Sequence, residues 1–222
     1  EHTGAVYGFI TMLLRYIETE QPDNITVAFD VHAPTFRHEM FEAYKGTRKP
    51  MDPELREQVP RMQEMLKAMG IPGVTLAGWE ADDILGTFGR QGEESGLEVT
   101  IVSGDRDLLQ LATDKVKISI PKTKMGGTEI ENYYAADVME KYGVNPTQFI
   151  DVKALWGDTS DNIPGVEGIG EKTATALIAQ WGSIEECHEH AAELKPPRAS
   201  KNIVEQWDTA VLSKTLATIN TQ

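Results

Sequence analysis

The chain has 222 residues, and its 35 acidic against 21 basic side chains give a formal net charge of −14. Hydrophobic residues make up 40% of the sequence and charged residues 25%, which is typical of a globular protein and excludes a disordered chain, a collagen or a coiled coil. The single cysteine, Cys187, excludes an internal disulfide framework, and no apolar run reaches the roughly 18–20 residues of a membrane span. We therefore expect a cytoplasmic protein that does not contact a membrane.

The first part of the chain predicts a helix followed by a strand. Apolar residues recur at three- and four-residue steps over residues 6–17, and Pro22 lies in the break that follows. Residues 25–29 (ITVAF) have the pattern of a buried strand, and Asp30 stands at its C-terminal end. A helix and a strand of this kind suit an α/β fold.

A second helix is predicted from its starting residues. Asp52 suits an N-cap and Pro53 the first helical position, with apolar residues recurring up to Met69. Pro60 should kink this helix, because proline lacks the N–H group that the helix needs. A short strand is expected over residues 74–77, followed by a third helix.

The next patterns complete a strand–helix alternation. Residues 97–102 and 116–120 read as strands, with a helix from about Asp107 between them. Such alternation is typical of βαβ units, so we expect an α/β fold with a mostly parallel sheet flanked by helices. Beyond these strands the patterns are helical. We expect an α/β domain over residues 1–130 and a helical domain over residues 131–222.

Acidic residues follow the predicted strands and also occupy one loop of the helical part. Ligands bind outside the carboxyl ends of parallel strands, although acids also favour helix N-termini and turns for structural reasons alone. Converging carboxylates would need cations among them, and oxygen-only ligands prefer Mg²⁺ or Mn²⁺. Without these eight side chains the net charge of −14 would be −6. The predicted metal ligands are Asp30, Glu80, Asp82, Asp83, Asp105, Asp107, Asp158 and Asp161.

Other kinds of site find less support in the sequence. His188 and His190 are two residues apart on a predicted helix, so their side chains should diverge, and Cys187 has no zinc-site spacing. No Ser/His/Asp or Cys/His arrangement can be argued, and the Walker A and Rossmann patterns are absent.

Two segments carry features that suit phosphate. Residues 35–49 hold four basic against two acidic side chains, interleaved with aromatic residues, as single-stranded nucleic acid would require; a solvated helix with core-facing aromatics is an equal alternative. Residues 165–172 (GVEGIGEK) resemble a helix–hairpin–helix turn whose N–H groups contact a phosphodiester backbone. Both segments therefore predict contacts with a nucleic-acid backbone.

Four stretches together resemble the 5′-nuclease, or flap endonuclease, domain of bacterial DNA polymerase I. They are VAFDVHAPTFRHEMFEAYKGTRKP (27–50), GWEADDILGTF (78–88), VSGDRDLLQL (102–111) and ALWGDTSDNIPGVEGIGEKTA (154–174). The resemblance covers nearly the whole chain. It implies a PIN-like fold with a mixed sheet, a helical arch at about residues 33–52, and a C-terminal helix–three-turn–helix element.

The resemblance also implies roles for individual residues. The first four predicted ligands, from Asp30 to Asp83, would surround one metal ion, and the last four, from Asp105 to Asp161, a second. Arch positions of the family that bind the DNA strand match Arg37, Tyr44, Lys45 and Arg48, of which Lys45 and Arg48 would act in catalysis. The family's turn that binds the duplex backbone matches Gly165, Gly168, Gly170 and Lys172. Backbone carbonyls near Val166 and Ile169 are similar to ones that hold a monovalent cation such as K⁺.

One departure from the family concerns the start of the chain. Members begin with a further strand that carries another metal-ligating aspartate, whereas residues 1–4 lead directly into the expected first helix. We therefore expect that strand to be missing from this sequence and the activity of the chain alone to be impaired.

The implied function is two-metal hydrolysis of DNA at 5′ flaps, nicks and 5′ ends, and of RNA primer ends, during replication and repair, including Okazaki primer removal. The expected protein is a monomer near the nucleoid, fused to a polymerase in its parent. Two alternatives remain: a helix–hairpin–helix module that binds DNA without cutting it, and a PIN-like ribonuclease.

Overall fold

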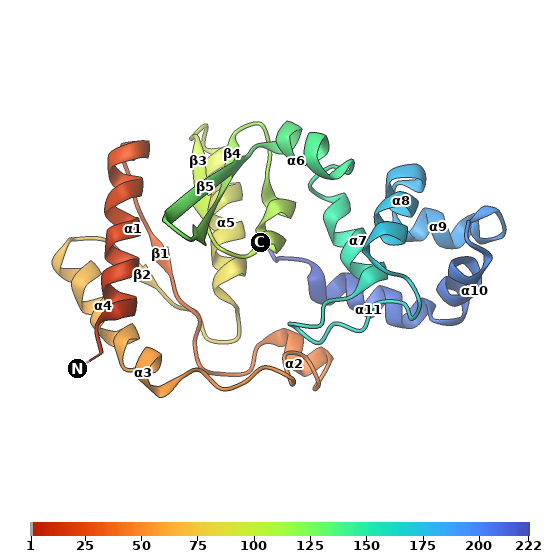
Figure 1. The fold of residues 1–222 in the computed structure, drawn as a ribbon, viewed down its shortest axis with the longest axis horizontal. Coiled ribbons are helices and arrows are strands. Elements are labelled where there is room, and N and C mark those ends of the chain that lie inside the picture. Colours follow the sequence, from red (N-terminus) through yellow and green to blue (C-terminus); the bar gives the residue numbers. More distant parts are fainter. Residues whose placement is uncertain (1) are drawn as a thin grey trace. The chain divides into compact units, whose positions relative to one another are not determined.

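The structure is a computed structural model that describes residues 2–222. Two compact units divide the chain: the first runs to Thr35 and resumes over Arg48–Ala81, and the second comprises Phe36–Thr47 and Asp82–Gln222 (Figure 1). A short segment of the first half of the chain therefore belongs to the second unit. No helix within the described residues combines the length and the apolar character that a membrane crossing requires.

The first unit contains three helices and a pair of short parallel strands. These are α1 (Gly4–Glu20), β1 (Val27–Ala28), α3 (Pro53–Arg56), α4 (Gln58–Ala68) and β2 (Gly73–Val74). Val27 pairs with Gly73 and Ala28 with Val74. α1 packs against α4. The predicted helix and strand at the start of the chain are confirmed, although the strand is shorter than its apolar run.

The predicted helix that starts at Pro53 is two helices in the structure. The Asp52 side chain accepts a hydrogen bond from the Glu54 N–H group (2.8 Å), which confirms the N-cap. The helix breaks at Glu57, close to the kink expected from Pro60, because proline cannot donate to the carbonyl four residues earlier.

The second unit contains a three-stranded sheet. β3 (Val99–Val102) pairs in parallel with β4 (Val116–Lys124), and β4 pairs antiparallel with β5 (Gly127–Tyr133). α5 (Ala81–Glu94) precedes the sheet, and η1 (Arg106–Leu111) is a 3₁₀ helix that directly follows β3. The core around these elements comprises Ile101, Leu108, Leu109, Ala112, Val116, Ile118, Ile120, Tyr133, Val138 and Ile219.

The sheets differ from the prediction in one respect. β1–β2 and β3–β4 are parallel as expected, but β4 and β5 form an antiparallel hairpin that the sequence analysis did not predict. Glu129 and Glu131 lie within β5, so its sequence lacks the apolar run of a buried strand. The architecture is α/β with two small sheets, one parallel and one mixed.

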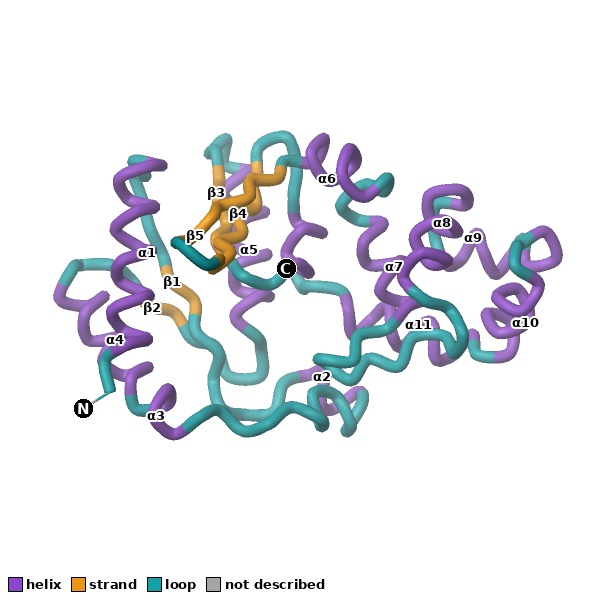
Figure 2. The backbone as a smooth tube through the Cα atoms, in the orientation of Figure 1, coloured by secondary structure: helices purple, strands orange, loops and turns teal. Residues whose placement is uncertain are grey.

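The rest of the second unit is helical, and loops join its short helices (Figure 2). The elements are α2 (Phe36–Met40), α6 (Ala135–Tyr142), α7 (Gln148–Trp156), α8 (Glu171–Trp181), α9 (Ile184–Glu189), η2 (Ala191–Glu193), α10 (Pro197–Glu205) and α11 (Trp207–Ala217). Helices α7, α8, α9, α10 and α11 share a core that includes Leu155, Leu177, Ile178, Ile184, Cys187 and Ile203. Burial raises the pKa of the Cys187 thiol to about 12, so this cysteine is a packing residue.

Candidate metal centre

A short loop after α7 carries two of the predicted metal ligands. Asp158 and Ile163 form an antiparallel bridge, with each backbone N–H group donating to the carbonyl of the other (2.9 and 2.8 Å). Gly165 has φ +64°, and a Cβ atom there would lie 2.5 Å from the Gly157 nitrogen. Only glycine fits this close approach, which closes the loop and fixes the backbone around Asp158 and Asp161.

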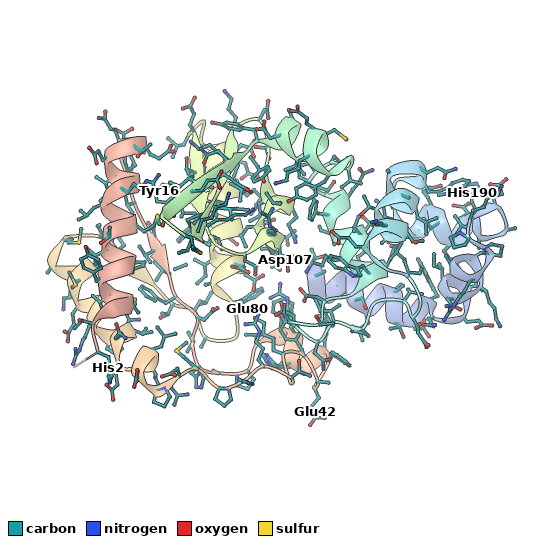
Figure 3. All side chains as sticks on the ribbon, in the orientation of Figure 1. His2, Tyr16, Glu42, Glu80, Asp107 and His190 are labelled. Carbon is teal, nitrogen blue, oxygen red and sulfur yellow. The ribbon has the colours of Figure 1, made fainter. Side chains whose placement is uncertain are left out.

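The end of β3 carries two further predicted ligands. Asp105 caps η1, because its carboxylate accepts a hydrogen bond from the Asp107 N–H group (2.8 Å). The Ser103 hydroxyl accepts in turn from the Asp105 N–H group (3.1 Å). This capping turns the chain immediately after the strand and fixes the backbone at Asp107, whose side chain Figure 3 labels.

The two stretches meet in one group of carboxylates. One side-chain oxygen from each of Asp107, Asp158 and Asp161 lies within 4.8 Å of the others. The ammonium group of Lys153, on α7, lies 3.0 Å from Asp107 Oδ1 and 2.5 Å from Asp158 Oδ2. Both aspartate side chains are largely buried, so these charges interact through little solvent.

The pKa values of the two carboxyl groups that pair with Lys153 are shifted in opposite directions. Burial raises the pKa of Asp107, the nearby charges of Asp105 and Asp158 add to this, and Lys153 opposes them, leaving it at about 6. Burial also acts to raise the pKa of Asp158, but hydrogen bonds from Lys153 and Ser160 outweigh it and bring the value to about 2. The ionised form of Asp107 is therefore costly in the metal-free protein.

The group has the donor chemistry of a site for a hard divalent cation. It offers carboxylate oxygens alone, which suit Mg²⁺ or Mn²⁺, and two of its carboxylates, Asp107 and Asp158, contact one cationic atom, the Lys153 nitrogen. Because these two carboxylates share a single ammonium group, negative charge is in excess there. A divalent cation fits both the donors and that excess.

Asp83, by contrast, is part of a buried network that does not require a metal. Its two oxygens accept from the two terminal nitrogens of Arg37 (2.8 Å each), and its Oδ1 also accepts from the Asn220 N–H group (2.8 Å). Arg37 donates further to the carbonyls of Leu216 and Thr218. Both side chains of the pair are less than 5% exposed, so this network anchors α2 to the end of the chain.

The remaining predicted ligands lie elsewhere. Asp82 is half-buried in the first turn of α5. Asp30 and Glu80 belong to the first unit, where Asp30 accepts from the Ala81 N–H group (2.8 Å) and Glu80 is buried. Their expected grouping around a first metal ion stays a prediction.

The basic, aromatic segment packs against the acidic loop. Tyr44 is 4% exposed and forms a small core with Ile163 and Leu216, as in the core-facing alternative left open by the sequence. The Lys45 N–H group donates to the Asp161 carbonyl (2.8 Å), and Asn162 Nδ2 donates to the Ala43 carbonyl (2.7 Å). The Lys45 backbone therefore joins the loop that carries Asp161.

The glycine-rich turn joins α7 to α8. Its first part is held by side chains: the Gly165 N–H group donates to Ser213 Oγ and the Glu167 N–H group to Gln206 Oε1 (2.9 Å each). Within residues 2–222, no protein acceptor bonds the N–H groups of Gly168 and Gly170. These two groups, together with the exposed Lys172 side chain, suit an anion.

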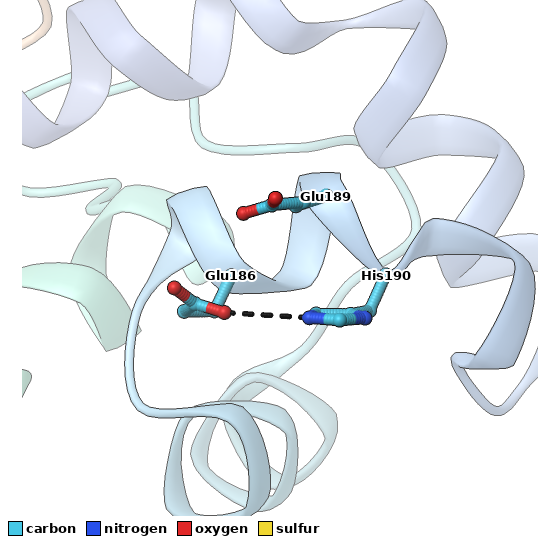
Figure 4. A group of neighbouring side chains, drawn as sticks. All are labelled: Glu186, Glu189 and His190. Carbon is cyan, nitrogen blue, oxygen red and sulfur yellow. Dashed lines mark ion pairs between the residues drawn. The ribbon is translucent and has the colours of Figure 1, made fainter.

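A second group of potential ligands is exposed on α9 (Figure 4). Glu186, Glu189 and His190 lie on successive turns, and the two nitrogens of His190 already face Glu186 (3.5 Å) and Glu193 (3.4 Å). The His190 ring also stacks on Trp181. This surface arrangement lacks the burial of the group around Asp107.

The sequence analysis missed Lys153, which is central to the carboxylate group. A single lysine on a helix carries no recognisable pattern. Its position five residues before Asp158, across the end of α7, becomes meaningful only once Asp107 is brought beside it by the fold.

Carboxylates that follow a strand, together with a glycine-rich turn between helices, agree with the class of nucleases that the sequence resembles. Residues 1–143 match the family described as "5′-3′ exonuclease, N-terminal resolvase-like domain", and residues 144–222 match "5′-3′ exonuclease, C-terminal SAM fold". The chain belongs to the 5′-3′ exonuclease family.

Curated relatives agree with this assignment. The chain is 48% identical to DNA polymerase I of Bacillus caldotenax over 98% of its own length, and 50% identical to that of Geobacillus stearothermophilus, also over 98%. It spans 25% of the length of each. It therefore corresponds to the 5′-3′ exonuclease part of these longer proteins.

Solved structures share the fold. The bacteriophage T5 5′-exonuclease with bound zinc has a TM-score of 0.79 at 24% identity, with 100% of this chain and 83% of that chain covered. A complex of the T5 flap endonuclease with DNA and metal ions has a TM-score of 0.77 at 23% identity, covering 100% and 82%. The catalytic core of Rad2 with DNA reaches 0.60 at 15% identity, covering 98% and 71%.

Proposed function

We propose that this chain hydrolyses DNA phosphodiester bonds at 5′ ends and 5′ flaps, and that Asp107, Asp158 and Asp161 hold a divalent metal ion for this reaction. The observation that carries the proposal is the meeting of three carboxylate oxygens within 4.8 Å, from two distant parts of a chain of the 5′-3′ exonuclease family. The T5 enzymes of similar fold have been solved with divalent metals and with DNA.

The chain's own residues prepare the site. A bound Mg²⁺ or Mn²⁺ would supply positive charge to a phosphate and lower the pKa of a water molecule. The bridge between Asp158 and Ile163 fixes the direction of the carboxylates, and the cap at Asp105 does the same for Asp107. Lys45 would contribute positive charge where the phosphate becomes more negative. Of the other predicted ligands, Asp30, Glu80 and Asp82 would serve a further metal ion, and Arg48 would act with Lys45 in the reaction.

The turn between α7 and α8 would hold duplex DNA. Gly168 and Gly170 offer backbone N–H groups without protein acceptors, and Lys172 adds an exposed positive charge, so a phosphate could bind without base recognition. A monovalent cation at the carbonyls near Val166 and Ile169 would complete the turn.

The biological role would follow from the relatives. Because DNA polymerases I at 48–50% identity contain this region as 25% of their length, we place the chain in a longer, monomeric polymerase that removes flaps and RNA primer ends during replication and repair. Such a protein would act at the nucleoid in the cytoplasm.

A cleavage assay tests the function and its rivals together. A 5′-flap duplex, a nicked duplex and single-stranded RNA are incubated with the chain in Mg²⁺ or in EDTA. We expect Mg²⁺-dependent cutting of the flap and no cutting of RNA. Binding without cutting would favour a helix–hairpin–helix module, and preferential RNA cleavage would favour a PIN-like ribonuclease.

The role of Lys45 has a separate test. The Lys45→Ala variant should lower the turnover of flap cleavage by about 10²-fold, because fixed charge acts in the transition state. Its free energy of unfolding should change by less than about 0.5 kcal/mol. Lys67→Ala, at an exposed position on α4, is the matched control. Equal turnover in the two variants would remove Lys45 from the reaction.

A further inference from the structure

The ammonium group of Lys153 lies among the carboxylates of the candidate metal site. It contacts Asp107 and Asp158 at 3.0 and 2.5 Å, and these two side chains share the carboxylate group with Asp161. The Lys153 side chain is 16% exposed, so the ammonium group is part of the site and not a surface charge that happens to lie near it.

The contacts of Lys153 compete directly with metal coordination. Asp107 Oδ1 and Asp158 Oδ2 face the ammonium group, while Asp158 Oδ1 accepts from the backbone and hydroxyl of Ser160 (2.8 and 2.7 Å). Both oxygens of Asp158 therefore have partners within the protein. A metal ion could bind Asp158 Oδ2 only after the ammonium group has moved or shared that oxygen.

Lysine is suited to such an exchange. Its charge sits at the end of a flexible four-carbon chain, so the ammonium group can leave without a change in the helix backbone. The single positive charge of Lys153 is shared by two carboxylates, those of Asp107 and Asp158, whereas a divalent cation would match both negative charges. The Lys153 nitrogen lies 5.9 Å from the centre of the Trp156 ring, an exposed aromatic side chain on the same helix.

We propose that Lys153 is a built-in counter-cation: it holds the carboxylate group together without metal, and a divalent ion must displace it to bind. Lys153 thus lowers the metal affinity of the free protein and keeps the acidic site folded before metal arrives. The inference rests on the proposed function, because it assumes that this carboxylate group is the metal site.

The test measures metal binding, without DNA and without turnover. The Lys153→Met variant keeps the length and the apolar stem of the side chain but removes its charge. Titration with Mn²⁺, followed by electron paramagnetic resonance of the free ion, should show binding at least about tenfold tighter in Lys153→Met than in the wild type. Lys153→Arg, which keeps the charge, should stay close to the wild type.

A matched control comes from the same unit. Lys214 also bridges two carboxylates, Asp151 (2.8 Å) and Glu185 (2.9 Å), away from the proposed metal site. Lys214→Met should leave Mn²⁺ affinity unchanged. In buffer with a chelator, Lys153→Met should melt below the wild type, and saturating Mn²⁺ should reduce or reverse that difference.

The outcomes separate the inference from the proposed function. If Asp158→Asn does not weaken Mn²⁺ binding in the wild-type background, the carboxylate group is not the metal site and the proposed function fails. If Asp158→Asn weakens binding but Lys153→Met has the wild-type affinity, only the role of Lys153 is overturned. Weaker binding in Lys153→Met would likewise overturn it, since the lysine would then support the metal.

Discussion

The Arg37–Asp83 pair and the carboxylate group around Lys153 are both largely buried ionic sites in the second unit, but only the first is balanced. Arg37 and Asp83 form two parallel hydrogen bonds, and backbone groups satisfy their remaining atoms. Lys153 faces both Asp107 and Asp158, so two carboxylates share one ammonium group. We interpret the balanced pair as part of the fold and the unbalanced group as the proposed metal site.

The sharpest way to test this contrast is to remove one carboxylate from the unbalanced group. Asp158→Asn should lower Mg²⁺-dependent flap cleavage by at least about 10⁴-fold, because the metal loses a charged ligand. Circular dichroism should show an intact fold. Asp114→Asn, at an exposed turn, serves as the control. Cleavage at the wild-type rate would show that the carboxylate group is not the active site.

Removal of one partner of the balanced pair should lower the stability of the protein. Arg37→Met should lower the free energy of unfolding by about 3–5 kcal/mol, because Asp83 would remain buried without its partner. Urea denaturation measures this loss. The double variant Arg37→Met/Asp83→Leu should recover much of it, since no unpaired charge is then left. A single variant as stable as the wild type would contradict the structural role of the pair.

Removal of a carboxylate from the unbalanced group should instead raise the free energy of unfolding. In chelator at pH 8, Asp107→Asn should raise the free energy of unfolding by about 1–3 kcal/mol, because asparagine resembles the neutral carboxyl that burial favours. Burial raises the pKa of Asp107 from 3.8 to about 6. The contribution of this carboxyl group to the free energy of unfolding of the wild type is therefore complete below about pH 4 and is lost as the pH rises through about 6.

The stability gain of Asp107→Asn should therefore fall to near zero below about pH 4, as thermal melts at several pH values would reveal. The same variant should lose activity. A pH-independent gain would mean that the carboxylate is not strained in the metal-free protein.

Sequence alone could predict features that depend on neighbouring residues. The N-cap at Asp52 and the acids that follow β3 are local chemistry, and both lie where expected. The β5 strand was missed because Glu129 and Glu131 lie within it, so its sequence lacks the run of apolar residues that predicts a buried strand. Arg37 pairs with Asp83 and Lys153 with Asp107, each 46 residues away along the chain, and no local sequence pattern predicts such a pairing.

The smallest expected effect concerns the loop that carries Asp158 and Asp161, at the point where it contacts the segment 36–47. Asn162 has φ +55° and donates to the Ala43 carbonyl (2.7 Å), next to the bond from Lys45 to Asp161. Asn162→Gly removes only the side-chain hydrogen bond and should cost about 1 kcal/mol of unfolding free energy. Asn162→Ala also forces a Cβ into the left-handed region and should cost about 1 kcal/mol more.

Urea denaturation of the two Asn162 variants separates the hydrogen bond from the backbone strain. If the loop also positions Lys45 beside the carboxylates, flap cleavage should fall in both variants by a similar factor, because both lose the bond to Ala43. One outcome is that Asn162→Ala is less stable than Asn162→Gly while both cut flaps at the same reduced rate. In that case the hydrogen bond serves the function and the left-handed backbone serves folding. Unchanged cleavage in both would confine Asn162 to the fold.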